Sequence, residues 1–159
     1  MFDFFKKNNV PLTVIAPIGG ILVKLSDISS DKKFHGFAII PDNGRKVIRC
    51  PMNGKATRLP NSSQAILISH SEGIELVIHI GIDTKNMYGA SFDSYKSKVK
   101  DVNQGQKLSQ LSSNMVEHAG LDAAIIVIFV HGYEKFIPMH EQYGSDVECG
   151  DVLMVEKSH

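Results

Sequence analysis

The residue best placed to do chemistry is His79, which interrupts an alternating run over residues 73–84. Every second position of this run is a large aliphatic residue, which predicts a β-strand with one apolar face (Ile74, Leu76, Ile78, Ile80 and Ile82). His79 falls on the opposite face, where Gly81 and Asp83 follow it. A neutral imidazole is a nucleophile near neutral pH, and a neighbouring glycine leaves space for an approaching group. A histidine in a strand is more often structural, so the alternation alone leaves a structural and a catalytic role open.

A resemblance to a known family favours the catalytic role. Residues 73–84 read Gly-Ile-Glu-Leu-Val-Ile-His-Ile-Gly-Ile-Asp-Thr, which is similar to the phosphorylation-site strand of the glucose-class IIA component of the bacterial sugar phosphotransferase system. In that family the histidine carries a phosphoryl group, so the resemblance implies that His79 is a phosphoryl acceptor. It also implies that the carbonyl of Gly81 holds one ring nitrogen as a donor and leaves the other nitrogen free to react.

Three further segments resemble the family's opening strand, its Ala-Pro-Val-x-Gly element and the segment after its active strand (residues 14–20, 50–54 and 88–92). The resemblance runs through residues 12–108. It returns at residues 147–153, which are similar to the family's last turn and strand, whereas residues 109–146 match weakly.

The family's second active-site histidine is replaced in this chain. In relatives it stands fifteen residues before the phosphorylated histidine and stabilises the incoming group, and counting back from His79 reaches Gln64. A glutamine amide can donate to a phosphate oxygen, but it cannot become cationic or shuttle a proton. Ser62 matches a threonine that orients the second histidine in relatives, and it could orient the Gln64 amide similarly. The resemblance therefore implies that acceptance at His79 survives and that onward transfer is weakened.

The residue beside His79 depends on how the preceding hairpin turns. A two-residue loop sets Gln64 opposite His79, whereas a three-residue loop with Gly73 as a bulge sets Ala65 there. The residues alone leave both registers open. Because the family places its second histidine beside the first, we expect the pairing of Gln64 with His79. His70 is expected to be a solvated residue next to the turn.

Partners are expected to contact four residues around the histidine (Leu67, Val77, Asp83 and Lys85). Asp83 matches the acidic residue with which relatives meet a basic phosphocarrier, although it could equally cap the turn that follows. Lys85 stands where relatives have a valine, and the loop over residues 27–36 is shorter than its family counterpart. The interface therefore departs from the family pattern.

Composition narrows the class of protein. The 159 residues are 43% hydrophobic, which suits one domain with a real core. Seventeen basic residues balance seventeen acidic ones, so no overall field attracts nucleic acid. Cys50 and Cys149 are too few for a disulfide scaffold, which fits a reducing cytoplasm. We expect no signal peptide, because Lys6 and Lys7 follow the N-terminal apolar cluster, and no membrane span, because the longest apolar run, residues 123–130, is too short. Residues 2–7 are expected to touch a membrane surface at most peripherally.

The apolar runs predict an all-β fold. They are short, β-branched and bounded by Gly, Pro, Asn or Asp (residues 12–16, 21–25, 37–40, 47–50, 65–69, 74–82, 124–130 and 152–155). Only residues 91–97 and 109–119 are expected to form helical turns. We expect a compact antiparallel β-sandwich, as the resemblance also implies, with residues 1–11 as an N-terminal tail and residues 12–159 as a single domain.

Two internal repeats indicate that the sandwich is duplicated. Residues 17–25 recur at 51–59 with proline, glycine, a basic residue and leucine in register. Residues 102–108 recur at 147–153 as Val-x-x-Gly-x-x-Leu. Opening prolines and turn glycines that are used twice suggest two similar β-units packed face to face.

The resemblance supports two functions of different classes. The first is a phosphoryl carrier that accepts phosphate from an HPr-type phosphocarrier on His79 and passes it to a IIB domain of a sugar permease. The second is a regulatory binding module with impaired onward transfer, which Gln64, Lys85 and the short loop favour. No cofactor is expected. Relatives can share a zinc ion between the two histidines and a partner carboxylate, but Gln64 removes one ligand, so we expect no metal.

Overall fold

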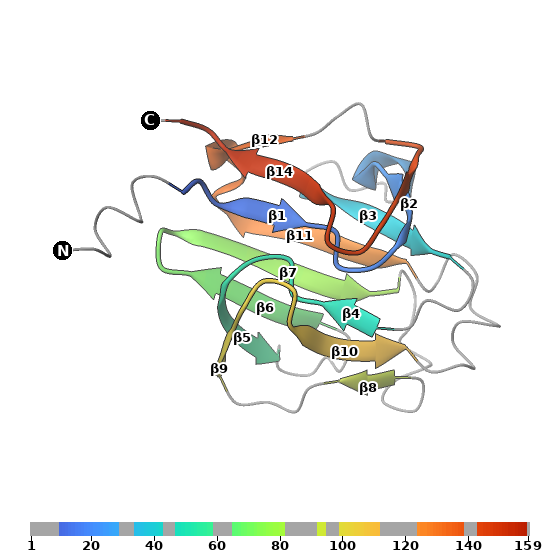
Figure 1. The fold of residues 1–159 in the computed structure, drawn as a ribbon, viewed down its shortest axis with the longest axis horizontal. Helices are drawn as coiled ribbons and strands as arrows, with labels where there is room; N and C mark the ends of the chain where they lie inside the picture. The colour runs from blue at the N-terminus through green and yellow to red at the C-terminus, as the bar shows by residue number, and fades with distance from the viewer. Residues whose placement is uncertain are drawn as a thin grey trace.

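The computed structural model describes residues 10–28, 34–42, 47–58, 65–81, 92–94, 99–111, 124–138 and 143–158. In these ranges the chain consists of antiparallel β-strands with two short 3₁₀ turns, η1 (Leu25–Asp27) and η4 (Tyr133–Lys135) (Figure 1). The predicted all-β fold is confirmed. No helix in the described part of the chain is long and apolar enough to cross a membrane.

One large sheet carries most of the strands. Its order is β13-β2-β3-β11-β7-β6-β5-β9, and neighbouring strands are antiparallel throughout. The strands are β2 (Gly20–Val23), β3 (His35–Pro41), β5 (Gly54–Arg58), β6 (Ala65–His70), β7 (Ile74–Ile80), β9 (Lys100–Val102), β11 (Ile125–His131) and β13 (Asp146–Val147). In this order β7 lies in the interior of the sheet, between β6 and β11.

Two smaller sheets complete the described fold. One has the order β1-β14-β12 and the other β4-β10-β8 (Figure 1). Their strands are β1 (Thr13–Ile15), β14 (Val152–Glu156), β12 (Phe136–Pro138), β4 (Val47–Arg49), β10 (Lys107–Leu111) and β8 (Phe92–Ser94). The helical turn expected at residues 91–97 is wrong at 92–94, and the one expected at 109–119 is wrong at 109–111. In both places the backbone pairs as a strand with its neighbour in the β4-β10-β8 sheet.

Strand β7 has the alternation that the sequence predicts. Four aliphatic side chains of this strand are fully buried, and the residues between them are half-buried (Ile74, Leu76, Ile78 and Ile80 against Glu75, Val77 and His79). Each fully buried aliphatic side chain contributes about 1.5–3 kcal/mol to folding. Ile82, the last apolar residue of the predicted run, lies outside the described residues.

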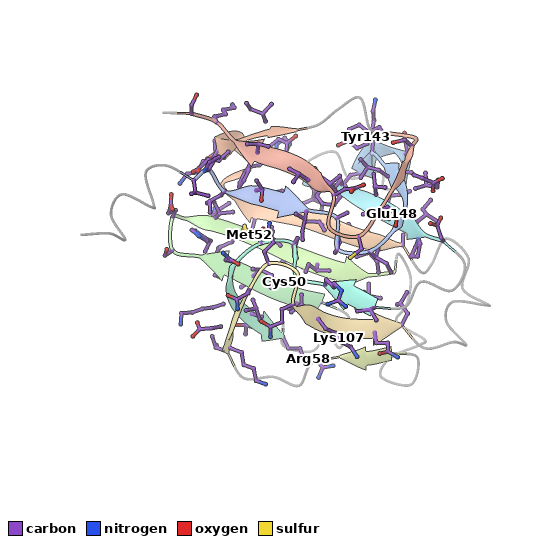
Figure 2. All side chains as sticks on the ribbon, in the orientation of Figure 1. Cys50, Met52, Arg58, Lys107, Tyr143 and Glu148 are labelled. Atoms are coloured by element: carbon purple, nitrogen blue, oxygen red, sulfur yellow. The ribbon has the colours of Figure 1, made fainter. Side chains whose placement is uncertain are left out.

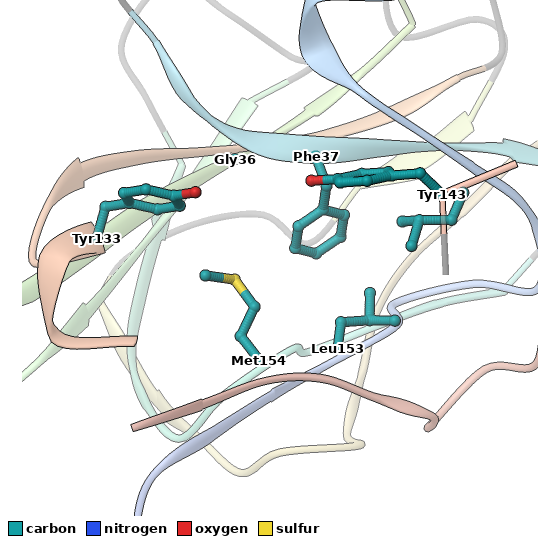
Figure 3. Close-up of a pocket in the computed structure, with 7 residues that line it drawn as sticks. Gly36, Phe37, Tyr133, Tyr143, Leu153 and Met154 are labelled. Carbon is teal, nitrogen blue, oxygen red and sulfur yellow. The ribbon is translucent and has the colours of Figure 1, made fainter. Parts of the chain in front are cut away.

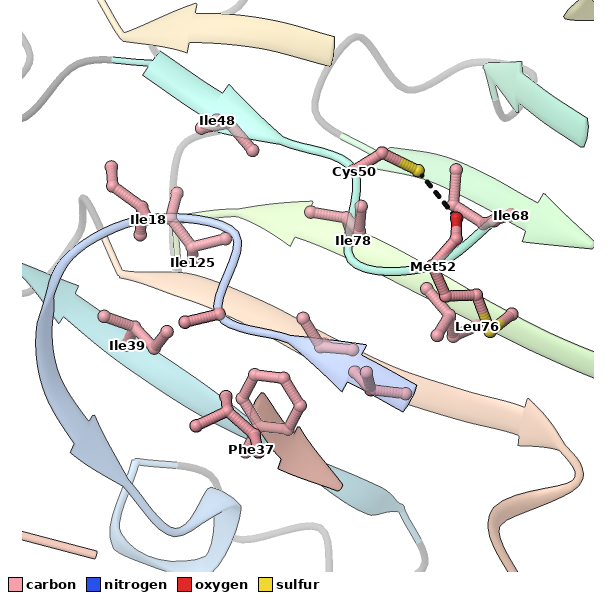
Figure 4. Close-up of a cluster of buried hydrophobic side chains, with 14 of the residues drawn as sticks. Ile18, Phe37, Ile39, Ile48, Cys50, Met52, Ile68, Leu76, Ile78 and Ile125 are labelled. Carbon is pink, nitrogen blue, oxygen red and sulfur yellow. Dashed lines mark hydrogen bonds between the residues drawn. The ribbon is translucent and has the colours of Figure 1, made fainter. Parts of the chain in front are cut away.

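The core contains one cysteine. Cys50 and Met52 are fully buried near the centre of the molecule (Figure 2). The Cys50 thiol donates a hydrogen bond to the Met52 carbonyl at 2.9 Å, among aliphatic side chains of the large sheet (Figure 4). Burial raises the pKa of Cys50 to about 11, and the hydrogen bond to Met52 only partly opposes this shift. Cys50 is therefore a protonated core residue at neutral pH.

The two sequence repeats occupy equivalent positions in the fold. Matching main-chain hydrogen bonds join them (Ile15 N to Pro51 O, 3.0 Å; Arg49 N to Pro17 O, 2.8 Å; Gly150 N to Ala16 O, 2.9 Å; Gly105 N to Cys50 O, 2.8 Å). Gly105 and Gly150 both adopt a positive φ, 88° and 98°, which explains why each repeat places glycine there. The duplicated arrangement expected from the sequence is present.

Candidate functional site

His79 lies on the face of the large sheet that points away from the core. Its neighbours in the register are Ala65 on β6 and Ile126 on β11. Residues that are directly opposite in antiparallel strands have Cβ atoms about 4.5–5.5 Å apart on the same face. Ala65 is buried, whereas Ile126 and His79 are half-buried. The imidazole therefore stands between one small and one large side chain.

A main-chain carbonyl fixes the tautomer of this imidazole. His79 Nδ1 lies 2.7 Å from Gly81 O. A carbonyl oxygen only accepts hydrogen bonds, so Nδ1 carries the hydrogen in the neutral ring and Nε2 keeps its lone pair. This is the contact that the resemblance implied.

The conformation of Gly81 directs its carbonyl toward the histidine. Gly81 is buried and has a φ of 82°, which side chains of L residues rarely allow. Its N–H donates to Ala124 O at 2.6 Å. The residue whose carbonyl holds His79 is therefore anchored, through its own N–H, to the residue that precedes β11.

Aliphatic residues surround His79 on the same face of the sheet. The register places seven half-buried aliphatic side chains there, which we call the apolar face (Ile21, Val23, Ile40, Leu67, Val77, Ile126 and Ile128). Val77 and Leu67, which we expected to contact partners, lie directly opposite each other two positions along the strands from His79 and Ala65. A contiguous accessible apolar patch is typical of a protein interaction site.

A polar band borders the apolar face on one side. Lys55 Nζ lies 3.0 Å from Asp101 Oδ1, and Ser69 Oγ donates to Glu75 Oε2 at 3.3 Å. The other oxygen of this carboxylate, Glu75 Oε1, lies 3.7 Å from His131 Nε2. These residues follow one another across β9, β5, β6, β7 and β11. On these strands the apolar face therefore ends at Leu67 and Val77, next to the polar band.

The expected pairing of Gln64 with His79 is wrong, because Ala65 stands opposite His79. The β6–β7 hairpin has a three-residue loop, in which Gly73 N donates to His70 O at 3.1 Å. Gly73 has a φ of 83°, so the loop uses the left-handed conformation that a glycine allows. The alternative register, which the sequence also permitted, is the one in the structure.

The same register separates His70 from the ring of His79. His70 pairs with Ile74, which is five positions before His79, so the two histidines are about 17 Å apart along the strands. His70 Nδ1 accepts a hydrogen bond from Glu72 N at 3.1 Å, next to the turn. His70 therefore does not serve as a second histidine for His79.

Four of the predicted site residues lie outside the described part of the chain (Ser62, Gln64, Asp83 and Lys85). Their roles stay predictions. Among the residues that the structure describes, no group of three or more His, Cys, Asp and Glu side chains could hold a metal ion.

Sequence reasoning missed the contribution of β11 to the site. Ala124 and Ile126 belong to the part of the chain where the family resemblance is weak. The available signal was the β-branched run at residues 124–130, which predicted a strand but did not say which strand it would pair with. Its position beside β7 is a property of the tertiary structure.

A narrow crevice, away from His79, lies between β3, β14 and η4. Apolar residues form its floor, and the rings of Tyr133 and Tyr143 point toward one another from its two sides (Figure 3). Burial, and secondarily the neighbouring Tyr133, raises the pKa of Tyr143. The crevice has a volume of about 10 Å³, which accommodates about one water molecule. It is too narrow for a substrate.

Comparisons with known proteins agree with this fold. A family model described as phosphoenolpyruvate-dependent sugar phosphotransferase system, EIIA 1, matches residues 12–136. The glucose-specific EIIA component of Mycoplasma capricolum is 29% identical over 160 residues, which cover 97% of this chain and 99% of that protein. The glucosamine-specific EIICBA component of Bacillus subtilis is 33% identical over 128 residues, which cover 77% of this chain and 20% of that longer protein.

Among solved structures, glucose permease IIA from Mycoplasma capricolum matches with a TM-score of 0.77 and 27% sequence identity. The match covers 94% of this chain and 97% of that one.

Proposed function

Because the chain belongs to the EIIA 1 family of the phosphoenolpyruvate-dependent sugar phosphotransferase system, it is a phosphoryl carrier in sugar transport, and we propose that His79 carries the phosphoryl group. The observation that supports His79 is the 2.7 Å contact between its Nδ1 and Gly81 O. This contact leaves Nε2 as the nucleophilic atom, on the half-buried side of the strand.

The transfer follows from this arrangement. The Nε2 lone pair attacks the phosphorus of the donor, an N–P bond forms, and the bond between phosphorus and the donor breaks with its electron pair left on the donor. Nδ1 keeps its hydrogen, so the phosphorylated ring carries positive charge. The Gly81 carbonyl stabilises this charge through the hydrogen bond that it already accepts. Onward transfer is the reverse sequence with a new acceptor.

The apolar face supports docking of the two transfer partners around His79. We infer that an HPr-type phosphocarrier and a IIB domain each cover Val77 and Leu67, since these side chains lie two positions along their strands from His79 and Ala65 on the same face. A basic phosphocarrier would also meet Asp83, as the resemblance implies. The system to which the family belongs supports a cytoplasmic location for these exchanges.

The second candidate function is regulatory binding with impaired onward transfer, and Gln64 is the observation that favours it. A glutamine at this position cannot supply the positive charge that a second histidine supplies in relatives. Under this hypothesis His79 still accepts a phosphoryl group, and its phosphorylation state controls the binding of other proteins.

Phosphoenolpyruvate-dependent labelling tests the role of His79. Enzyme I, the phosphocarrier and labelled phosphoenolpyruvate should label the wild-type chain, and His79→Ala should abolish the label. His70→Ala is the matched control, because His70 lies at the far end of the same hairpin, and it should label normally. Label that persists in His79→Ala would contradict the proposal. Transfer of the label to a IIB domain then separates the carrier from the regulatory module.

A further inference from the structure

We propose that β11 positions the reactive histidine and that Ile126 is the positioning residue on this strand. The inference rests on the proposed role of His79 as the phosphoryl acceptor, and it assigns a role to a segment that the sequence left unexplained. Its basis is the row of side chains that crosses the sheet at His79, together with the main-chain hydrogen bond between Gly81 and Ala124.

The row Ala38, Ile126, His79, Ala65 runs across β3, β11, β7 and β6. Its two large side chains are adjacent, and an alanine flanks each of them on the outer side. Ala38 and Ala65 are both buried and have only a methyl group to offer the neighbouring side chains. Ile126 is therefore the one large residue that stands directly beside the imidazole in this row.

An isoleucine is suited to act as a rigid wall. Its β-branch restricts rotation about χ1, so its position beside the ring varies little. The small Ala65 on the opposite side offers the ring only a methyl group. The ring is thus supported by a large side chain on the β11 side alone.

The same strand also anchors the hydrogen bond to the ring. Ala124, two positions before Ile126, accepts the Gly81 N–H at 2.6 Å, and Gly81 O contacts His79 Nδ1 at 2.7 Å. The Ala124 contact holds Gly81 through its N–H, the Gly81 carbonyl orients the ring, and Ile126 limits the rotation of the ring. Without the side chain of Ile126, the single hydrogen bond would be the main restraint on the imidazole.

Positioning and docking have different kinetic signatures. A misplaced nucleophile lowers the rate of transfer at saturating donor, whereas a lost docking contact raises the donor concentration needed for half-saturation. Ile128 is the matched control, because it lies on the same face of β11 two positions further on and pairs with Val77 instead of His79. Both isoleucines are half-buried.

The experiment compares Ile126→Ala, Ile126→Val and Ile128→Ala. The first measurement is ¹⁵N NMR of the His79 imidazole in the isolated protein, which reports the Nδ1–H tautomer without any partner. The second is single-turnover transfer from the phosphorylated phosphocarrier as a function of its concentration. Dispersed amide spectra verify that each variant is folded, and Ile126→Thr, which keeps the β-branch but replaces the apolar end, substitutes for Ile126→Ala if that variant does not fold.

We expect Ile126→Ala to weaken the Nδ1–H signature and to lower the maximal transfer rate about 10-fold or more, with a change below about 2-fold in half-saturation. Ile126→Val should remain close to wild type, and Ile128→Ala should change half-saturation more than maximal rate. The proposal is overturned if Ile126→Ala leaves the tautomer signature unchanged or behaves as Ile128→Ala does. If wild-type protein accepts no phosphoryl group, the proposed function fails, while the NMR measurement still decides whether Ile126 positions the ring.

Discussion

Replacing Gly81 with alanine isolates the hydrogen bond that holds His79. Gly81 has a φ of 82°, and an L residue in this region costs about 1–2 kcal/mol. If the backbone keeps this conformation, the variant loses only that stability. If the backbone relaxes to negative φ, the carbonyl turns away and the contact with His79 Nδ1 is lost as well. A neutral hydrogen bond contributes a net of about 0.5–1.5 kcal/mol.

A second glycine provides the control for backbone strain. Gly105 has a φ of 88°, an added Cβ there would meet no atom within 4 Å, and it lies in the turn after β9, an edge strand that pairs with neither β7 nor β11. Gly105→Ala should therefore lose about 1–2 kcal/mol of stability through strain alone. Gly81→Ala should lose that amount and up to about 1.5 kcal/mol more.

The assays are urea unfolding and single-turnover phosphoryl transfer to His79. A loss of up to about 1.4 kcal/mol in the orientation of the nucleophile corresponds to a rate decrease of up to about 10-fold in Gly81→Ala. Gly105→Ala should accept the phosphoryl group at the wild-type rate. Equal stability losses for the two variants, together with an unchanged rate in Gly81→Ala, would refute the claim that the Gly81 carbonyl orients the ring.

Three further outcomes are expected. Burial raises the pKa of Cys50 from 9.0 to about 11, so the folded state keeps a proton that the unfolded chain loses. The free energy of unfolding, measured by urea titration, should therefore fall by on the order of 2–3 kcal/mol between about pH 9 and pH 11. The fall should be smaller in Cys50→Ala. Val77→Asp should raise the phosphocarrier concentration for half-maximal transfer about 10-fold, because docking would bury an unpaired carboxylate. Ile137→Asp, on the separate β1-β14-β12 sheet, should leave this concentration unchanged in the same titration. Although Ala65 stands opposite His79, the resemblance still implies a role in transfer for position 64. Gln64→His should therefore accelerate onward transfer to a IIB domain about 10²-fold with a smaller effect on acceptance, measured from pre-labelled protein, and equal onward rates would contradict that role.

Local patterns in the sequence were sufficient to predict most of the strands and the face on which His79 lies, whereas its proposed chemical role came from the resemblance. The alternation around His79 predicts a strand because successive side chains of a strand point to opposite faces, whatever the partner strand is. The repeated glycines were informative in the same way, since Gly105 and Gly150 stand in equivalent turns of the two repeats, and both turns need a positive φ. A single chain therefore carries enough local information for strand positions and for the duplicated arrangement.

The register and the surroundings of the histidine were decided by the tertiary structure. A glycine at position 73 is compatible with a two-residue or a three-residue loop, and one residue of slip moves Ala65 into the place expected for Gln64. Ile126 and Ala124 lie more than 40 positions from His79 in the chain, and an apolar run does not encode which strand it joins. Strand pairing is selected by the burial of all apolar faces together, so the contacts of the His79 imidazole with β11 and with Gly81 exist only once the sheet has assembled.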